Sequence, residues 1–399
     1  MKKVSIRLCP ICNCNSCEVL RHQRFILPEG HPLSDSYDVV CCERCGFVYA
    51  DTTVSQKDYD MFYTKFSKYA DSNILGGGDK PCDKERLSQT AAYLQNYLCD
   101  KEAKIIDVGC SNGGLLKSLK EVGYKNLTGI DPSPLCVQNT ISNDGIQGFV
   151  GTLSTVITNK MKYDCVILSH VMEHIQDLQD ATSFISKLLT RRGLVYIEVP
   201  DATRYKDYIY APFQDFNTEH INHFSLQSLS NLFSQFGFTS LSQGSRTINS
   251  APGKLYPVIY AIFIKSIRYK QAKIIKEKLL IDNISQYITR CQDFLCRMDN
   301  VIKTILAEYP EIIIWGTGQL AMKLLVDTCL KEAKIMAFVD GNPINQGKLI
   351  RGIEVKAPEQ IIGLNYPILI TSTIHQEEIE ATIRDMALPN MIFSLNGNF

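Results

Sequence analysis

The sequence predicts a doubly wound α/β domain, preceded by a cysteine-rich segment and followed by a second α/β unit. From about Ala92 to Leu241, short apolar runs alternate with helix-like stretches, which is typical of a parallel sheet with helices on both faces. Paired cysteines stand near the start of the chain, and a second strand-to-glycine turn begins at Ile312. A chain of 399 residues has room for two or three such domains.

The cysteine pairs indicate a metal site. Cys9 and Cys12 form one doublet, Cys42 and Cys45 form another, and Gly46 permits a tight turn after the second. Each doublet can offer two thiolates to one tetrahedral ion, so these four cysteines predict a structural zinc site. A closed set of four thiolates leaves no coordination position for catalysis.

The neighbouring cysteines leave the choice of ligands open. Cys14 and Cys17 form a further doublet, and Cys41 directly precedes the second pair, so the ligand set can shift by one pair. A disulfide framework is the alternative. The lack of a secretory signal and the scatter of the other cysteines favour the metal site and a cytoplasmic location.

Aromatic residues follow the cysteines at spacings of three and four, which predicts a helix packed on a neighbouring domain. One or two of these rings are also candidates for a lid over a ligand cleft, with Gly76–Gly78 as its hinge. The aromatic residues are Tyr59, Phe62, Tyr63, Phe66 and Tyr69.

A glycine-containing turn predicts an adenosine cofactor site. The turn spans 107–114, follows a short apolar run and precedes a helix-like stretch, and a second strand ends on Asp131, 24 positions after Asp107. Glycines let the backbone approach a ligand, and the carboxylate ending the second strand can accept ribose hydroxyls. Asp107 precedes the first glycine, where it would repel a pyrophosphate but suit a cationic amino-acid group.

This motif, Asp107-x-Gly109-x-x-x-Gly113, resembles that of the class I S-adenosylmethionine (SAM) methyltransferases. In that family the aspartate helps to hold the methionyl end of SAM, and a glycine often stands where this chain has Ser111. The alternative is a turn of the same shape without a ligand. The resemblance implies SAM as cofactor, bound by Asp107, Gly109, Cys110, Gly113, Asp131, Pro132, Thr152, Ser169 and His170.

Three further strands extend the resemblance. Gly148–Thr152 is expected to be the third strand with its turn, in the segment that flanks adenine in the family. Tyr163–His170 reads as a buried fourth strand, and Gly193–Pro200 as the fifth. Between them, 171–175 is expected to open a helix with Glu173 and His174 as capping residues.

The segment after the fifth strand carries groups that can remove a proton near neutral pH. Glu219, His220 and His223 supply a carboxylate and two imidazoles. The two histidines are three residues apart, so a helical turn would place them on one side. Packing at a helix start is the alternative, and a metal site on the two histidines lacks an evident third ligand.

The last third of the chain is expected to be helical from Lys254 to about Leu306. Residues 256–267 are apolar, but the run is too short and too close to lysines for a membrane span. A strand and glycine turn at 312–319 and a strand ending on Asp340 predict a Rossmann-like unit. This unit either only packs on the central domain or also binds a nucleotide.

Together, the cysteine doublets, the SAM motif with Glu219-His220 after strand five, and the terminal unit resemble the sugar C-methyltransferases. The resemblance implies that Glu219 or His220 removes the proton beside the ketone of a nucleotide-linked ketosugar. His223 or Asn222 would stabilise the enolate, and Asn217 replaces a tyrosine of that family. The alternatives are O- or N-methylation of a small metabolite, a SAM-binding scaffold without turnover, and an NAD-dependent enzyme using the turn at Gly316.

These patterns predict five segments and argue against nucleic acid and membrane as partners. Lysine plus arginine equals aspartate plus glutamate at 42 each, which argues against nucleic acid or a membrane surface as partner. The oligomeric state is left open. The expected segments are a zinc ribbon (1–55), an aromatic helical linker or lid (56–90), the SAM-binding domain (91–250), a helical connection (251–305) and a Rossmann-like domain (306–399).

Overall fold

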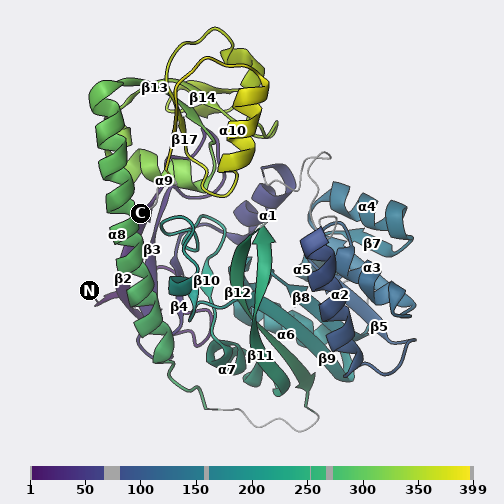
Figure 1. The fold of residues 1–399 in the computed structure, drawn as a ribbon. Helices are drawn as coiled ribbons and strands as arrows, with labels where there is room; N and C mark the ends of the chain where they lie inside the picture. The colour runs from purple at the N-terminus through teal and green to yellow at the C-terminus, as the bar shows by residue number, and fades with distance from the viewer. Residues whose placement is uncertain (1, 67–80, 157–160, 252, 267–272, 396–399) are drawn as a thin grey trace.

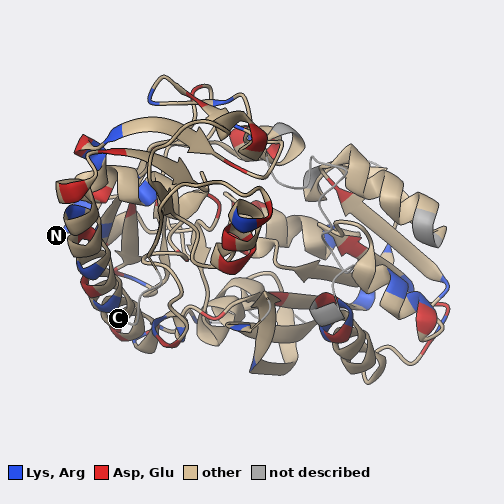
Figure 2. Cartoon of the chain, turned by 45° about the horizontal axis from the view of Figure 1, so that its top comes forward, with Lys and Arg blue, Asp and Glu red and all other residues tan. Residues whose placement is uncertain are grey.

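The computed structural model describes residues 2–66, 81–156, 161–251, 253–266 and 273–395, and these residues form three β-sheets (Figure 1). The mixed α/β class is confirmed, because parallel strands with flanking helices build the central and C-terminal sheets. In the described part of the chain, no helix combines the length and apolar character that crossing a membrane requires. Acidic and basic residues are interspersed over the outer helices and loops (Figure 2).

The N-terminal sheet is antiparallel and is completed by a strand from much later in the chain. Its order is β1-β2-β3-β4-β10. Strand β10 pairs with β4, placing Asn222 opposite Tyr49 and His223 opposite Val48. The helical turn expected for His220 and His223 is therefore wrong, because the backbone extends to join this sheet. The strands are β1 Lys2–Val4, β2 Ser16–Arg24, β3 Ser36–Cys42, β4 Val48–Asp51 and β10 Asn222–His223.

The aromatic helix is confirmed as α1, Gln56–Lys65. Ser55 caps it by accepting a hydrogen bond from the Asp58 N–H, and the Asp58 carboxylate accepts from the Ser55 N–H in return. Tyr59 and Phe62 are buried in the largest apolar cluster. Tyr69 and the expected Gly76–Gly78 hinge lie outside the described residues.

The central sheet has seven strands in the order β11-β12-β9-β8-β5-β6-β7, of which β5 to β9 run parallel. The chain leaves β5 for β6 on one side and later returns to β8 on the other, so β5 ends at the switch point where α/β sheets bind ligands. The strands are β5 Lys104–Val108, β6 Asn126–Asp131, β7 Gln147–Val150, β8 Tyr163–Ser169, β9 Leu189–Pro200, β11 Phe238–Ala251 and β12 Lys254–Lys265.

Helices cover both faces of this sheet (Figure 1). The amphipathic helices α3 and α6 bury leucines and isoleucines toward it, while their polar positions face outward. The helices are α2 Pro81–Gln95, α3 Gly114–Glu121, α4 Pro134–Asp144, α5 Leu153–Val156, α6 Leu178–Leu188 and α7 Leu226–Ser234, with short 3-10 turns at η3 Met172–His174 and η4 Tyr205–Asp207.

The helical pattern expected from Lys254 is wrong at its start. Residues 254–265 form β12, which lies between β9 and β11 and buries a continuous run from Val258 to Phe263, apart from the half-buried Tyr260. A short apolar run of this kind is compatible with a buried strand or a buried helix, and periodicity alone does not separate them. The hairpin also crosses the expected domain boundary at 250.

A long helix, α8 Leu279–Glu308, links the central sheet to the C-terminal unit along the N-terminal sheet (Figure 1). Its buried residues recur every three or four positions, as expected for one apolar stripe. The C-terminal sheet has the order β15-β16-β14-β13-β17-β18. Its elements are β13 Glu311–Trp315, α9 Gln319–Asp327, η5 Cys329–Glu332, β14 Lys334–Val339, β15 Leu349–Ile350, β16 Ile353–Lys356, η6 Pro358–Ile361, β17 Ile368–Ile370, α10 Gln376–Asp385 and β18 Ile392–Ser394.

Gly46 holds the second cysteine turn against the segment before α8. Its φ is +77°, and a Cβ there would overlap the backbone carbonyl of Glu277, whose N–H bonds to the Cys45 carbonyl at 2.9 Å. We expect Gly46→Ala to destabilise the protein by about 2–4 kcal/mol. The matched control is Gly30→Ala, where φ is +74° and no atom lies within 4 Å, so only about 1 kcal/mol is expected. Equal losses in thermal unfolding would contradict the packing argument.

Candidate active site

The turn after β5 is shaped by residues in the left-handed conformation. Gly109 has φ +74°, and a Cβ there would lie 2.6 Å from the Val171 side chain. Gly113 has φ +79°, and its Cβ would lie 2.9 Å from Thr140. Ser111 adopts φ +48°, which explains why a glycine suits this position and shows that serine tolerates it.

Two carboxylates lie at the adjoining strand ends. Asp131 accepts hydrogen bonds from the Ser111 and Ser133 N–H groups, both at 2.9 Å, so it fixes the turn after β5. Asp107 is 3% exposed. Burial, reinforced by the charge of Asp131, raises the pKa of Asp107 to about 8, although Arg86 opposes the shift. A cationic ligand group beside Asp107 would relieve this penalty.

The residues predicted to bind the cofactor all lie at the carboxyl ends of neighbouring parallel strands. Asp107 lies near the end of β5 and Gly109 to Gly113 follow it, Asp131 ends β6 and Pro132 follows, Thr152 follows β7, and Ser169 ends β8 with His170 next. The Cys110 side chain is buried beside Gly129 and Thr140, so only its backbone borders the turn.

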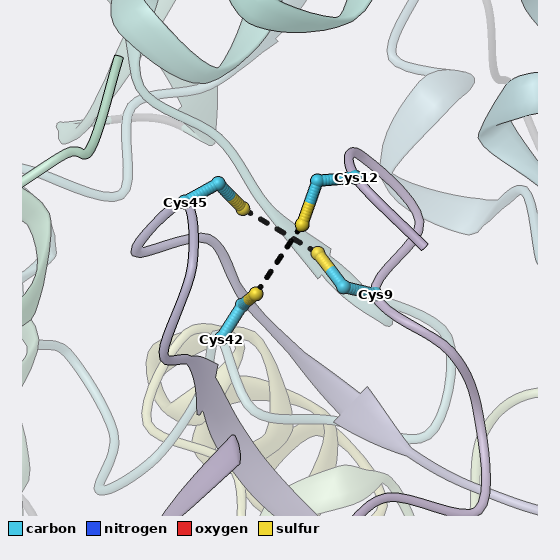
Figure 3. Close-up of side chains that lie close together, drawn as sticks. All are labelled: Cys9, Cys12, Cys42 and Cys45. Atoms are coloured by element: carbon cyan, nitrogen blue, oxygen red, sulfur yellow. Dashed lines mark hydrogen bonds between the residues drawn. The ribbon is translucent and has the colours of Figure 1, made fainter. Parts of the chain in front are cut away.

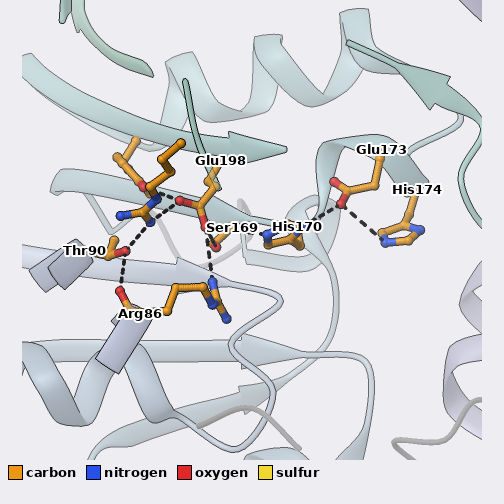
Figure 4. Close-up of polar contacts among 9 residues, drawn as sticks. Arg86, Thr90, Ser169, His170, Glu173, His174 and Glu198 are labelled. Carbon is orange, nitrogen blue, oxygen red and sulfur yellow. Dashed lines mark hydrogen bonds and ion pairs between the residues drawn. The ribbon is translucent and has the colours of Figure 1, made fainter. Parts of the chain in front are cut away.

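A row of polar side chains leads from the end of β8 toward a second group of residues (Figure 4). Glu198 of β9 lies 3.4 Å from Ser169 Oγ and 3.5 Å from His170 Nε2. His170 Nδ1 lies 3.2 Å from Glu173 Oε1, and that carboxylate oxygen is 3.9 Å from His174 Nε2. From the sequence, Glu173 and His174 are expected only as helix caps, and no motif marks Glu198.

The carboxylate of Glu198 is fully buried, and cations compensate for its burial. Arg86 of α2 lies 3.2 Å from it, Arg246 of β11 pairs with its second oxygen, and the Tyr196 hydroxyl donates to it at 2.9 Å. Burial would raise the pKa of Glu198, but the hydrogen bond and charge of His170 and the two arginines lower it well below its usual range. The group thus connects α2 and the β11–β12 hairpin to His170.

A second group of side chains surrounds Glu219 and His220. The Tyr63 hydroxyl donates to Glu219 Oε2 at 3.3 Å, and the His174 ring contacts the rings of His220 and Tyr63 edge-on at centroid distances of 4.9 and 5.6 Å. His174 Nδ1 lies 3.0 Å from the Glu219 carbonyl oxygen. A carbonyl only accepts hydrogen bonds, so Nδ1 is the nitrogen that donates to it.

Glu173, His174 and His220 have ligand-type atoms within 4.8 Å of one another. The structure thereby supplies the third group that the two-histidine metal hypothesis lacked, although it uses His174 in place of His223. Burial would raise the pKa of Glu173, but the hydrogen bond from His170 and the charges of the nearby histidines hold it below its usual range. An ionised Glu173 can share a proton with these rings as well as coordinate a cation.

Asn217 positions the Glu219-His220 pair. Its Oδ1 accepts hydrogen bonds from the N–H groups of both residues at 2.8 Å, and its carbonyl accepts one from Tyr37. This asparagine, which stands where the sugar C-methyltransferases have a tyrosine, therefore shapes the local turn.

Asn222 and His223 form β10, and both side chains are buried. The Asn222 amide donates to the carbonyls of Met172 and Ile175 and accepts from Arg7, so the expected role of Asn222 at an enolate is wrong. His223 is fully buried, and its ring packs edge-on against those of Phe216 and Tyr205. A contact between His223 and substrate would require displacement of its packing.

The buried guanidinium of Arg7 joins the surrounding segments. It donates to the carbonyls of Ala50, Ile175, Gln176 and Ile221. Its own N–H bonds to Asp51 at 2.8 Å. Burial lowers the pKa of Arg7 to about 10, which leaves the group charged at neutral pH.

Four thiols converge between the two cysteine turns (Figure 3). Cys9 Sγ lies 3.5 Å from Cys45 Sγ, Cys12 Sγ lies 3.4 Å from Cys42 Sγ, and all four sulfurs lie within 4.8 Å. A disulfide requires about 2.05 Å, so these contacts are not disulfides. The thiols of Cys14, Cys17 and Cys41 instead approach backbone carbonyls at 3.7–3.8 Å.

A family model described as a methyltransferase domain matches residues 83–243, from α2 into β11. The chain contains a SAM-dependent methyltransferase domain. A second family model, described as C2185-like, N-terminal, matches residues 308–391, which include the C-terminal sheet except for its last strand.

Beyond the methyltransferase domain, the chain is similar to C-methyltransferase NovU from Streptomyces niveus. The two are 21% identical over 343 residues, covering 82% of this chain and 77% of the relative. EEF1A lysine methyltransferase 2 from Homo sapiens is 29% identical over 80 residues, 20% of this chain, and the match spans about a third (32%) of that protein. The solved magnesium protoporphyrin IX methyltransferase from Synechocystis is 17% identical, with a TM-score of 0.37, over 46% of this chain and 84% of that one.

The charge on His170 makes the stability of this domain depend on pH. Burial would lower the pKa of His170, but hydrogen bonds to Glu173 and Glu198 outweigh it and raise the pKa to about 9. Because this lies above the unfolded value of about 6.5, the stabilisation is complete below pH 6.5 and is lost as pH rises through 9. We expect His170→Gln to cost up to about 3 kcal/mol at pH 6 and much less at pH 9.5.

Thermal unfolding at both pH values checks this expectation. His375→Gln is the control, because that exposed histidine pairs with Glu378 only at the surface and should contribute little at either pH. A His170→Gln penalty that is the same at pH 6 and pH 9.5 would contradict the charge-based account.

Proposed function

We propose that the protein transfers a methyl group from SAM to the carbon beside the ketone of a nucleotide-linked ketosugar. The observation that carries this proposal is the position of Glu219 and His220, which contact Tyr63 and His174 at the far end of the polar row from Ser169. The similarity to C-methyltransferase NovU supports it, because that match extends well beyond the methyltransferase domain.

The residues around the β5 turn fit SAM. The carboxylate of Asp107 suits the ammonium of its methionyl end, and Asp131 retains lone pairs for the ribose hydroxyls beside the two N–H groups that it already accepts. When bound, SAM supplies a methyl group on a positively charged sulfur. Asp107 and Asp131 lie close enough to repel each other, and a cationic ligand group would offset that repulsion.

His220 is the proposed base, with Glu219 as the alternative. His220 takes the proton from the carbon beside the ketone, and His174 and the Glu173 carboxylate stabilise the resulting imidazolium. If the Tyr63 hydroxyl turns away from Glu219, it can donate a hydrogen bond to the developing enolate oxygen of the substrate. The polar groups are already oriented by Asn217 and by the Glu219 carbonyl, which reduces the ordering needed during reaction.

The C-terminal unit is proposed to shape the substrate cleft and to contact the nucleotide. The Gln319 amide at the start of α9 donates to Thr218 Oγ1 at 2.9 Å, directly before Glu219. Asp340 at the end of β14 accepts from the Thr317 N–H at 2.9 Å and from its hydroxyl at 2.5 Å, as Asp131 accepts from the first turn.

Cys9, Cys12, Cys42 and Cys45 are proposed to hold structural zinc. The donor set fits, because four buried thiols from two turns converge at distances that one tetrahedral ion can span. Bound zinc would fix the cysteine turns next to Phe47, whose ring contacts Phe224 beside β10.

Methyl transfer tests the proposed base. We test the variants His220→Gln and Glu219→Gln. The one that removes the base should lower kcat by about 10²–10⁴-fold, because no group then takes the proton from the substrate carbon. S-adenosylhomocysteine affinity by calorimetry should not change. His22→Gln is the control, since this largely exposed histidine lies on β2.

The assay uses SAM with a deuterated methyl group and a panel of nucleotide-linked 4-ketosugars, read by mass spectrometry and NMR. A label on carbon supports the proposal, while a label on oxygen or nitrogen establishes the alternative acceptor. Binding of S-adenosylhomocysteine without transfer to any ketosugar excludes this substrate class. Full activity in both variants excludes the assigned base.

Metal analysis tests the zinc site. Protein purified under reducing conditions should contain one zinc per chain, and Cys42→Ser should lose most of it and lower the unfolding temperature. Cys41→Ser is the matched control, because its thiol approaches only a backbone carbonyl and should leave zinc in place. Equal zinc loss in both variants would contradict the assigned ligands.

A further inference from the structure

A cluster of buried polar groups adjoins the candidate base, and only one of its members, Glu173, takes part in the mechanism above. It draws Tyr205 from η4, Asp215 from the following loop, His223 from β10 and Glu173 from η3. None of these four residues is more than 2% exposed. Tyr256 of β12 completes the cluster by donating its hydroxyl hydrogen to Asp215 Oδ1 at 2.6 Å.

Several atoms in this cluster lack a hydrogen-bond partner within the described protein. They are the Tyr205 hydroxyl, Asp215 Oδ2, both ring nitrogens of His223 and Glu173 Oε2. A buried polar atom without a partner costs about 1–3 kcal/mol, so five of them in one neighbourhood are improbable unless something small and polar satisfies them. Water is the ligand that can donate and accept at such mixed sites.

The cluster is contiguous. The Tyr205 and His223 rings meet edge-on with centroids 5.9 Å apart, and Tyr205 lies within electrostatic range of both Glu173 and Asp215. Asp215 is also held by its own N–H, which donates to the Tyr287 hydroxyl at 3.1 Å. One end of the cluster therefore adjoins Glu173, next to His174 and His220, and the other ends at Asp215.

We propose that Glu173, Tyr205, His223, Asp215 and Tyr256 form a water-holding chamber that carries the substrate-derived proton from His220 to Asp215. The proposal rests on the proposed function. In the reaction, the substrate C–H bond breaks and its electron pair stays on the substrate, while an N–H bond forms on His220. That N–H bond then breaks as an O–H bond forms on Asp215 through bridging water, and Asp215 gives the proton up to solvent before the next turnover, so no oxidant or further reactant is required.

The surroundings of Asp215 suit a proton acceptor. The titratable groups that face it are Tyr205, Tyr256, Tyr287 and the Cys291 thiol, none of which is a cation. Burial raises the pKa of Asp215 to about 7, although hydrogen bonds from Tyr256, Tyr287 and Gln214 oppose the shift. The carboxyl can thus gain and lose a proton near neutral pH.

A comparison of single-turnover and steady-state rates separates methyl transfer from the later movement of the proton to Asp215. With the ketosugar identified by the transfer assay, Asp215→Asn should leave the single-turnover rate within about twofold of the unaltered protein. Steady-state kcat should fall about tenfold or more with KM unchanged, so that a burst of one turnover appears. Tyr256→Phe should show the same pattern more weakly. Glu277→Gln is the control, because this buried carboxylate bonds Ser225 and Leu279 instead.

Equal losses in the single-turnover and steady-state rates, or no loss in either variant, would overturn the relay. Two measurements need no substrate. The infrared difference between the unaltered protein and Asp215→Asn should show a protonated carboxyl that disappears with a midpoint near pH 7. An atomic-resolution crystal structure should show water bonded to Tyr205 and Asp215, and a dry chamber would overturn the proposal. If these hold while no ketosugar is methylated, the proposed function fails and the chamber stands without that proton source.

Discussion

The buried guanidinium of Arg7 is the interaction on which the arrangement of the N-terminal sheet and the candidate active site depends. Its donors satisfy carbonyls at the end of β4, after η3 and before β10, so one side chain ties the N-terminal sheet to both segments of the candidate active site. Carbonyls, not a paired carboxylate, surround most of the group. Without it, several buried acceptors would lose their donors at once, and the His174 and His220 segments would no longer share a fixed frame.

Two sets of polar side chains in the central domain add to the contacts made by Arg7: those around Glu198, and the row from His170 to His174. Glu198 gathers Arg86, Arg246 and His170 around one buried carboxylate, so α2 and the β11–β12 hairpin are held to the end of β8. His170 then reaches Glu173, which adjoins His174. Adding or removing a charge at either end therefore changes the electrostatic energy of the other groups in the row, because solvent screens buried groups poorly.

Local features were predictable from the sequence, whereas features made by long-range contacts were not. The Asp107 turn and the cysteine doublets carry their chemistry within a few residues, and the structure brings those residues together. The spacing of the aromatic residues includes Tyr63, but only tertiary packing brings it to Glu219, and no sequence pattern marks Glu198. The strand at 254–265 was missed because a doubly buried strand carries no alternating pattern.

The pairing of β10 with β4 has a consequence for how the chain folds as it is synthesised. The four cysteines lie within the first 45 residues, so their cluster can assemble while most of the chain is still unmade. The N-terminal sheet gains β10 only after Asn222 and His223 have been synthesised. Arg7 likewise bonds to the carbonyl of Ile221, which lies 214 residues later in the chain. The edge of β4 therefore stays unpaired while the central domain is synthesised, and it can pair with a wrong strand until β10 arrives.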